Sequence, residues 1–143
     1  MILRAFLRAH IWTLSGVVPL LVRLISLERL VRLLTPRFRP YRSIPDSEMV
    51  ELVRRRLRRP RNMKRRRCLR LGLTLYHFLR LSGREAVIRF AVYPGLSNDR
   101  MHAHCWVTLG GLCVSEPPAA AAVEVFRYPE PAGTDCRNAA SAA

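Results

Sequence analysis

Apolar and polar positions follow a helical period through the first half of the chain and a strand-like period after residue 85. Residues 2–14 and 18–34 are mostly apolar and predict two helices, with a break near Ser15–Gly16 or at Pro19. The proline-punctuated segment 35–40 then predicts a linker.

Two further helices are predicted before the pattern changes. The first begins in the capping segment 45–48 and ends near Leu57. The second begins at Cys68, reaches about Ser82 and ends at Gly83, a residue suited to the left-handed position after a helix. Leucine and aromatic side chains cover most of this second helix, so we expect it at the centre of the core.

The remaining elements read as strands. Residues 86–93, 103–109 and 123–128 are rich in β-branched and aromatic residues, and Gly110–Gly111 predicts a hairpin turn from which residues 112–115 pair back. Helices followed by antiparallel strands predict an α+β fold, with a helical N-terminal half packed on a small antiparallel sheet.

Length and charge narrow the functions that this fold can have. At 143 residues the chain has the size of one domain, which we divide into a helical region (1–58), a core (59–128) and a disordered tail (129–143). The 25 basic residues outnumber the 10 acidic ones, for a net charge of +15, and Lys64 is the only lysine. Such a surface attracts nucleic acid, anionic lipid or acidic peptide.

The cysteines and the N-terminal apolar run indicate the cellular compartment in which we expect the protein. The four cysteines form no CxxC pair and no regular framework, which favours the reducing cytoplasm. The apolar run 11–22 contains Pro19, is too short to span a bilayer, and is not followed by a small-residue cleavage site. We expect a packed or surface-lying helix, and peripheral membrane contact through residues 2–34 is compatible with it.

Cys68 and His104 are the candidate catalytic pair. Cys68 stands at a helix N-terminus after four basic residues, and both features favour the thiolate. His104 shares a strand face with Trp106 and Thr108, where a neutral imidazole could deprotonate a thiol. The structural alternatives are a buried cysteine that acts as a small apolar residue and a buried histidine beside a packed tryptophan.

The sequence around these residues resembles one family. Arg67-Cys68-Leu69 opens the leucine-rich helix, and Ala103-His104-Cys105-Trp106-Val107 precedes the glycine turn. Over roughly residues 60–116 this order is similar to the transglutaminase-like leader peptidases of lasso-peptide biosynthesis. In that family a basic residue precedes Cys-Leu, and Ala-His-Ala-Trp-Val-Glu precedes a glycine turn. The chain departs from the pattern at Cys105 and Thr108, where Ala and Glu are common.

The resemblance implies a transglutaminase/papain-like core with Cys68 as nucleophile, His104 as base and Glu116, in place of an Asp, as the third residue. A strict two-residue turn would put Glu116 opposite Cys105, on the wrong face. We therefore expect a bulged residue at Gly111 that brings Glu116 opposite Trp106. The implied partners are a lasso precursor peptide, a leader-recognition protein and an amidotransferase-like cyclase, and no cofactor is implied.

The arginine-rich stretch from residue 54 to residue 67 and the histidines leave alternatives open. With Trp106, the residues Arg55, Arg58 and Arg61 are candidate contacts for an acidic leader peptide or partner. A nucleic-acid-binding or membrane-surface adapter without enzymatic activity is the alternative, although no zinc finger, RNA-recognition signature or zipper is present, so nucleic acid is not expected as a partner. The other alternative is a metal site, whose spacing fits no structural zinc pattern. Its ligands would be His102, His104, Cys105 and Cys113.

Overall fold

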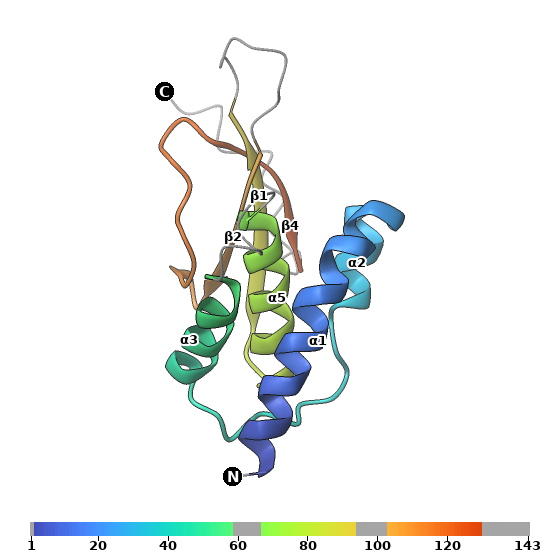
Figure 1. Cartoon of the computed structure of the whole chain (residues 1–143). Coiled ribbons are helices and arrows are strands. Elements are labelled where there is room, and N and C mark those ends of the chain that lie inside the picture. The colour runs from blue at the N-terminus through green and yellow to red at the C-terminus, as the bar shows by residue number, and fades with distance from the viewer. Residues whose placement is uncertain (1, 59–66, 94–102, 130–143) are drawn as a thin grey trace.

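The helix expected at the centre of the core, α5 (Arg67–Leu81), lies against one face of an antiparallel sheet (Figure 1). The computed structural model describes residues 2–58, 67–93 and 103–129, and these residues form four helices and four strands. The helices α1 (Ile2–Leu24) and α3 (Asp46–Leu57) pack against α5 and against each other. The short helix α2 (Leu27–Leu33) packs on α1. The predicted α+β architecture is confirmed.

The sheet has the order β3-β2-β1-β4. Its strands are β1 (Ala86–Val92), β2 (Ala103–Leu109), β3 (Leu112–Cys113) and β4 (Val123–Tyr128), and every neighbouring pair is antiparallel. Along β1 the residues Ala86, Ile88 and Phe90 are buried, and they pair with Leu109, Val107 and Cys105 of β2. These positions therefore form the face that α5 covers.

The helical N-terminal region and the sheet share one hydrophobic core. Leu7 and Val18 of α1, Val53 of α3 and Ile88 and Val107 of the sheet are all fully buried in the same cluster. Along α5, almost every residue from Leu71 to Leu81 is buried, because the sheet covers one side of this helix and α1 and α3 cover the other.

The predicted break of the first helix near Ser15–Gly16 or Pro19 is wrong. α1 continues through both positions to Leu24, and the chain turns only at residues 25–26. Pro19 removes one backbone N–H and costs about 3 kcal/mol inside a helix. The buried stripe Leu7, Ile11, Ser15 and Val18 runs up to this proline, and its packing on α5 outweighs the local cost.

The outer face of α1 is apolar and exposed. Its side chains recur at helical spacing on the side away from the core, at Ile2, Phe6, Val17, Leu20 and Leu24. By length and composition alone the 23-residue α1 could cross a membrane, although the shorter apolar run was expected to be too short. A core helix or a signal sequence passes the same test. Peripheral membrane contact through residues 2–34 stays a prediction.

Gly72 is the point where α5 approaches β2 most closely. A Cβ atom placed on Gly72 would overlap the Sγ atom of Cys105, which points from β2 toward the helix. The next nearest atom is the Cβ of Cys105, at 3.7 Å, which is ordinary contact. A residue without a side chain is therefore needed at position 72 as long as position 105 carries sulfur.

Gly72→Ala should lower the free energy of unfolding by about 1–3 kcal/mol, because the added methyl overpacks a close-packed interface. In the Cys105→Ala background the same change should be neutral or slightly stabilising, since alanine is the better helix former. Chemical denaturation of the two single variants and the double variant measures this coupling. Additive effects would show that the clash with Cys105 is not the cause.

Two histidines connect α1, the linker and α5. The Nδ1 atom of His10 lies 3.0 Å from the hydroxyl of Tyr41, and Nδ1 of His77 lies 2.7 Å from the carbonyl oxygen of Leu34. The two imidazole rings meet edge to face at 5.7 Å. Burial lowers the pKa of both residues, and for His77 the bond to Leu34 opposes this effect while the neighbouring His10 adds to it.

The free energy of unfolding should therefore fall as the pH drops below about 6.5, the value for histidine in an unfolded chain. Below that pH the unfolded chain binds protons more readily than the half-buried His10 and His77 do in the fold, so the unfolded state gains stability. His77→Gln retains an amide donor for the Leu34 carbonyl but cannot titrate. Thermal unfolding between pH 7.5 and 5 should show a shallower pH dependence for this variant than for the wild type, and equal slopes would exclude His77 as the source.

Candidate active site

Cys68 is the second residue of α5 and lies half-buried at its N-terminus, as predicted. Its Sγ atom is 4.0 Å from the carbonyl oxygen of Ala103, the residue that precedes His104. The first turn of a helix presents backbone N–H groups that have no partner within the helix. The thiol is thus placed beside potential donors for a developing oxyanion and next to the start of β2.

His104 is held by two contacts that fix its ring. The imidazole stacks on the indole of Trp106, with centroids 6.0 Å apart and planes inclined by 17°, which confirms that the two residues share a face. Its Nε2 atom lies 2.9 Å from the main-chain carbonyl oxygen of Glu116. A carbonyl can only accept, so Nε2 must carry the hydrogen, and the neutral ring keeps its free lone pair on Nδ1. Nδ1 is therefore the atom that can take a proton from a thiol.

The segment that reaches His104 leaves the sheet in a way that the sequence did not predict. Leu109 pairs with Leu112 and Thr108 with Cys113, a direct two-residue turn in which Gly110 and Gly111 have φ of 56° and 83°. The expected bulge at Gly111 is therefore wrong.

Ser115 and Arg54 turn the chain away from β2 after this hairpin. Val114 donates its N–H to the carbonyl of Val107 at 2.9 Å. The N–H of Val107 donates to the hydroxyl of Ser115, also at 2.9 Å. The carbonyl of Val114 accepts instead from the guanidinium of Arg54 on α3, again at 2.9 Å. The irregular segment 114–116 that follows β3 thus brings the Glu116 carbonyl to His104.

The carboxylate of Glu116 points elsewhere. It lies 3.3 Å from the guanidinium of Arg67, the residue before Cys68, and both side chains are largely exposed. Glu116 thus contacts His104 through its carbonyl, and its carboxylate contacts Arg67, the residue that precedes Cys68. The acceptor that orients the imidazole in this structure is a carbonyl and not a carboxylate.

A cavity of about 590 Å³ joins Cys68 to His104. Apart from these two residues its lining is largely apolar, and it comes from the elbow between α1 and α2, the start of α5 and the adjoining ends of β1 and β2: Val22, Ile25, Leu27, Leu30, Leu69, Phe90, Ala103 and Cys105. No hydrogen bond links Cys68 to His104 among the residues that the structure describes. Catalytic hydrogen bonds are often long without substrate and shorten when it binds.

A half-buried cysteine at the start of a central helix and a histidine on the neighbouring strand, together in one cavity, identify a cysteine-histidine site in an α+β fold. The model of the Transglutaminase-like superfamily matches residues 12–127, more than half of the chain. The chain belongs to this superfamily. The superfamily includes cysteine peptidases, and the matched range contains both candidate residues. No curated protein and no solved structure gives a significant match to the chain.

The other predicted residues of this transglutaminase-like domain that the structure describes do not line the cavity. Trp106 is 7% exposed and stacks on the His104 ring, and it does not line the cavity. Arg58 lines a small cavity of about 180 Å³ with Arg67 and Glu116, and Arg55 lines a separate one between α1 and α3. Arg61 lies outside the described residues.

Among the described residues no group of three His, Cys, Asp or Glu side chains could hold a metal ion. His102 of the alternative metal site lies outside them. Cys105, another of its candidate ligands, is buried and points toward Gly72.

Glu116→Gln should lower turnover at this site only a few fold, because the carbonyl that holds His104 stays in place. Only an exposed ion pair to Arg67 is lost, and such pairs contribute up to about 1 kcal/mol, or about fivefold. Ser115→Ala should cost more, because the hydroxyl that holds the segment to Val107 is removed. Steady-state kcat/KM of both variants distinguishes a main-chain from a carboxylate acceptor. If Glu116→Gln lowers kcat/KM as much as removal of the His104 imidazole does, the Glu116 carboxylate is the third residue of the triad after all.

Proposed function

We propose that this transglutaminase-like domain is a cysteine peptidase that removes the leader peptide from a lasso precursor. The observation that carries the proposal is the shared cavity of Cys68 and His104, in which the Glu116 carbonyl leaves Nδ1 of His104 as the proton acceptor. The likeness of the segments around Cys68 and His104 to leader peptidases supports the choice of substrate.

The proposed reaction follows from the chemistry of these groups. Nδ1 of His104 takes the thiol proton, and the thiolate of Cys68 attacks the carbonyl carbon at the junction of leader and core. Backbone N–H groups at the start of α5 stabilise the oxyanion. His104 then returns the proton to the leaving amine, which releases the core peptide. Water, deprotonated by His104, attacks the thioester, and the leader leaves as a carboxylic acid while the thiol is restored.

The largely apolar cavity suits a peptide better than a highly charged ligand, because desolvating charges against Leu30, Leu69 and Phe90 is costly. Under this proposal a leader-recognition protein delivers the precursor and an amidotransferase-like cyclase receives the released core. We place the enzyme in the bacterial cytoplasm, where the nucleophilic thiol stays reduced.

The test is to incubate the protein with a lasso precursor and its leader-recognition protein and to follow the masses of the products. A single cut between leader and core, and a transient adduct of the leader on Cys68 after acid quench, are the expected results. The alternative adapter predicts salt-dependent binding to DNA or RNA and no cut. Tight nucleic-acid binding at physiological salt without cleavage would overturn the peptidase proposal.

A further inference from the structure

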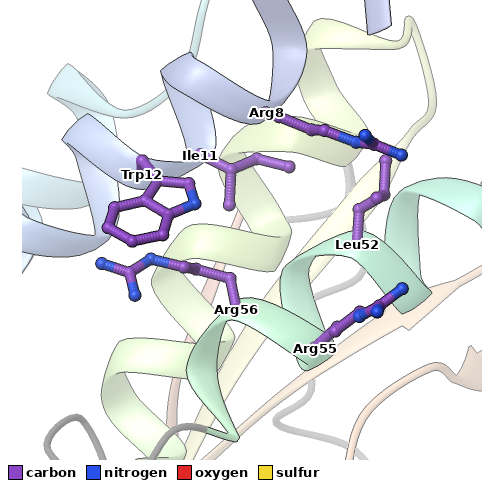
Figure 2. Close-up of a pocket in the computed structure, with 6 residues that line it drawn as sticks. All are labelled: Arg8, Ile11, Trp12, Leu52, Arg55 and Arg56. Carbon is purple, nitrogen blue, oxygen red and sulfur yellow. The ribbon is translucent and has the colours of Figure 1, made fainter. Parts of the chain in front are cut away.

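A second cavity, of about 470 Å³, lies between α1 and α3 (Figure 2). Its lining combines arginines with a tryptophan and two aliphatic side chains: Arg8, Ile11, Trp12, Leu52, Arg55 and Arg56. It shares no lining residue with the cavity of Cys68 and His104. Helices form both of its walls. Near it, the guanidinium of Arg4 on α1 donates two hydrogen bonds, of 2.8 and 2.9 Å, to the carboxylate of Glu48 on α3. The cavity is therefore built on rigid elements.

Two of the arginines that line this cavity, Arg8 and Arg55, carry charge without an ion-pair partner among the described residues. Both side chains are exposed. Glu48 of α3 forms an ion pair with Arg4. Glu51, one turn before Arg55, forms no ion pair with Arg55. An anion bound in the cavity would therefore meet positive charge that no carboxylate of the described residues offsets.

The third arginine has a different role. The guanidinium of Arg56 lies against the Trp12 ring (Figure 2), 3.5 Å from the ring centroid, so the two side chains hold each other in place. Trp12 is half-exposed, whereas Ile11 is buried and Leu52 is half-buried. The cavity therefore combines an apolar floor with cations that come from both helices. A glutamate or aspartate side chain fits such a site better than a bare inorganic anion, because its methylene groups can lie on the floor.

We propose that the cavity of Arg8, Trp12 and Arg55 binds an acidic segment of the peptide substrate, with carboxylates of that segment meeting Arg8 on α1 and Arg55 on α3. The choice of a peptide rests on the proposed function. Trp12 and Val22, a lining residue of the active-site cavity, are ten residues apart on α1, which is about 15 Å along the helix. An extended peptide covers this distance in about five residues. The acidic residue should therefore lie at least about five positions from the scissile bond.

The test uses the Cys68→Ala protein, which cannot cleave, with a fluorescein-labelled short polyglutamate peptide and its polyglutamine counterpart. Fluorescence anisotropy at low and at physiological salt should show binding of the glutamate peptide only. Arg8→Gln and Arg55→Gln should each weaken it by up to about fivefold, and the double variant by about twentyfold, as expected for exposed charge pairs. Arg29→Gln, which removes the same charge from the exposed surface of α2, should leave binding unchanged. Tryptophan emission should change on binding and should lose that change in Trp12→Phe.

Several outcomes would overturn the proposal. These are equal binding of the two peptides, equal effects of Arg29→Gln and Arg55→Gln, or tighter binding of a single-stranded DNA oligonucleotide through the same arginines. Circular dichroism of each variant verifies that its fold is intact. Cleavage of the precursor by a protein that fails this binding test would leave the peptidase proposal standing and remove only the acidic-segment site.

Discussion

Replacing Cys68 with alanine should abolish cleavage of the precursor and lower turnover by at least about a thousandfold, because the substitution removes the nucleophile itself. The change from thiol to methyl at a half-buried position removes little volume, so the thermal unfolding curve should stay close to that of the wild type. Mass spectrometry of the products and of the acid-quenched enzyme measures the loss of cleavage and of the covalent adduct, and a thermal melt measures the retained stability.

Cys105→Ala is the matched control for the nucleophile. Burial raises the pKa of the Cys105 thiol well above its ordinary value, and the nearby Cys68 raises it further, so this sulfur stays protonated. Cys105→Ala should therefore keep its activity while losing some stability, since the residue packs against α5. Wild-type cleavage by Cys68→Ala would contradict the cysteine-peptidase proposal, whichever way Cys105→Ala behaves.

His104→Gln should be nearly as damaging as the loss of Cys68. A glutamine amide can still donate to the carbonyl of Glu116 and can lie on Trp106, but it has no basic nitrogen that can take up a thiol proton. The defect should therefore appear in the acylation step, with the fold and peptide binding retained. Single-turnover kinetics with excess enzyme separates a defect in acylation from a defect in peptide binding, because the two steps give distinct phases.

His102→Ala is the comparison for the base, and we expect it to be mild. If both substitutions cost the same activity and elemental analysis finds stoichiometric zinc, the metal alternative replaces the peptidase. If added imidazole restores cleavage to His104→Ala, the ring acts as a base and its role is more than structural support.

The elements with strong periodicity could be predicted from the sequence because local and tertiary preferences agree in them. The strand pattern around Ile88 and the leucine-rich helix that begins at Cys68 lie within about one residue of their expected bounds. The shared face of His104 and Trp106 also followed from alternation alone. These features position the candidate pair.

The errors arose where tertiary contacts override a local signal. Pro19 is a strong local signal for a break, but the buried stripe that holds α1 to α5 is visible only in the packed structure. The path of Glu116 depends on a hydroxyl of Ser115 and a guanidinium of Arg54 sixty residues away in sequence. Ser115, a serine at the end of an apolar hairpin, was the one signal in the sequence, and its position does not predict which backbone group it binds.

The contact between Arg54 and the Val114 carbonyl limits how relatives of this protein can be recombined. A chimaera joined in the segment between α3 and α5 would take α3 from one parent and the hairpin after β2 from another. The guanidinium and the carbonyl that it binds would then come from different sequences. The imidazole of His104 depends on the carbonyl of Glu116, two residues after Val114. Crossover points that keep residues 46–57 and 112–116 from the same parent should preserve catalysis best, even though these segments are far apart in the chain.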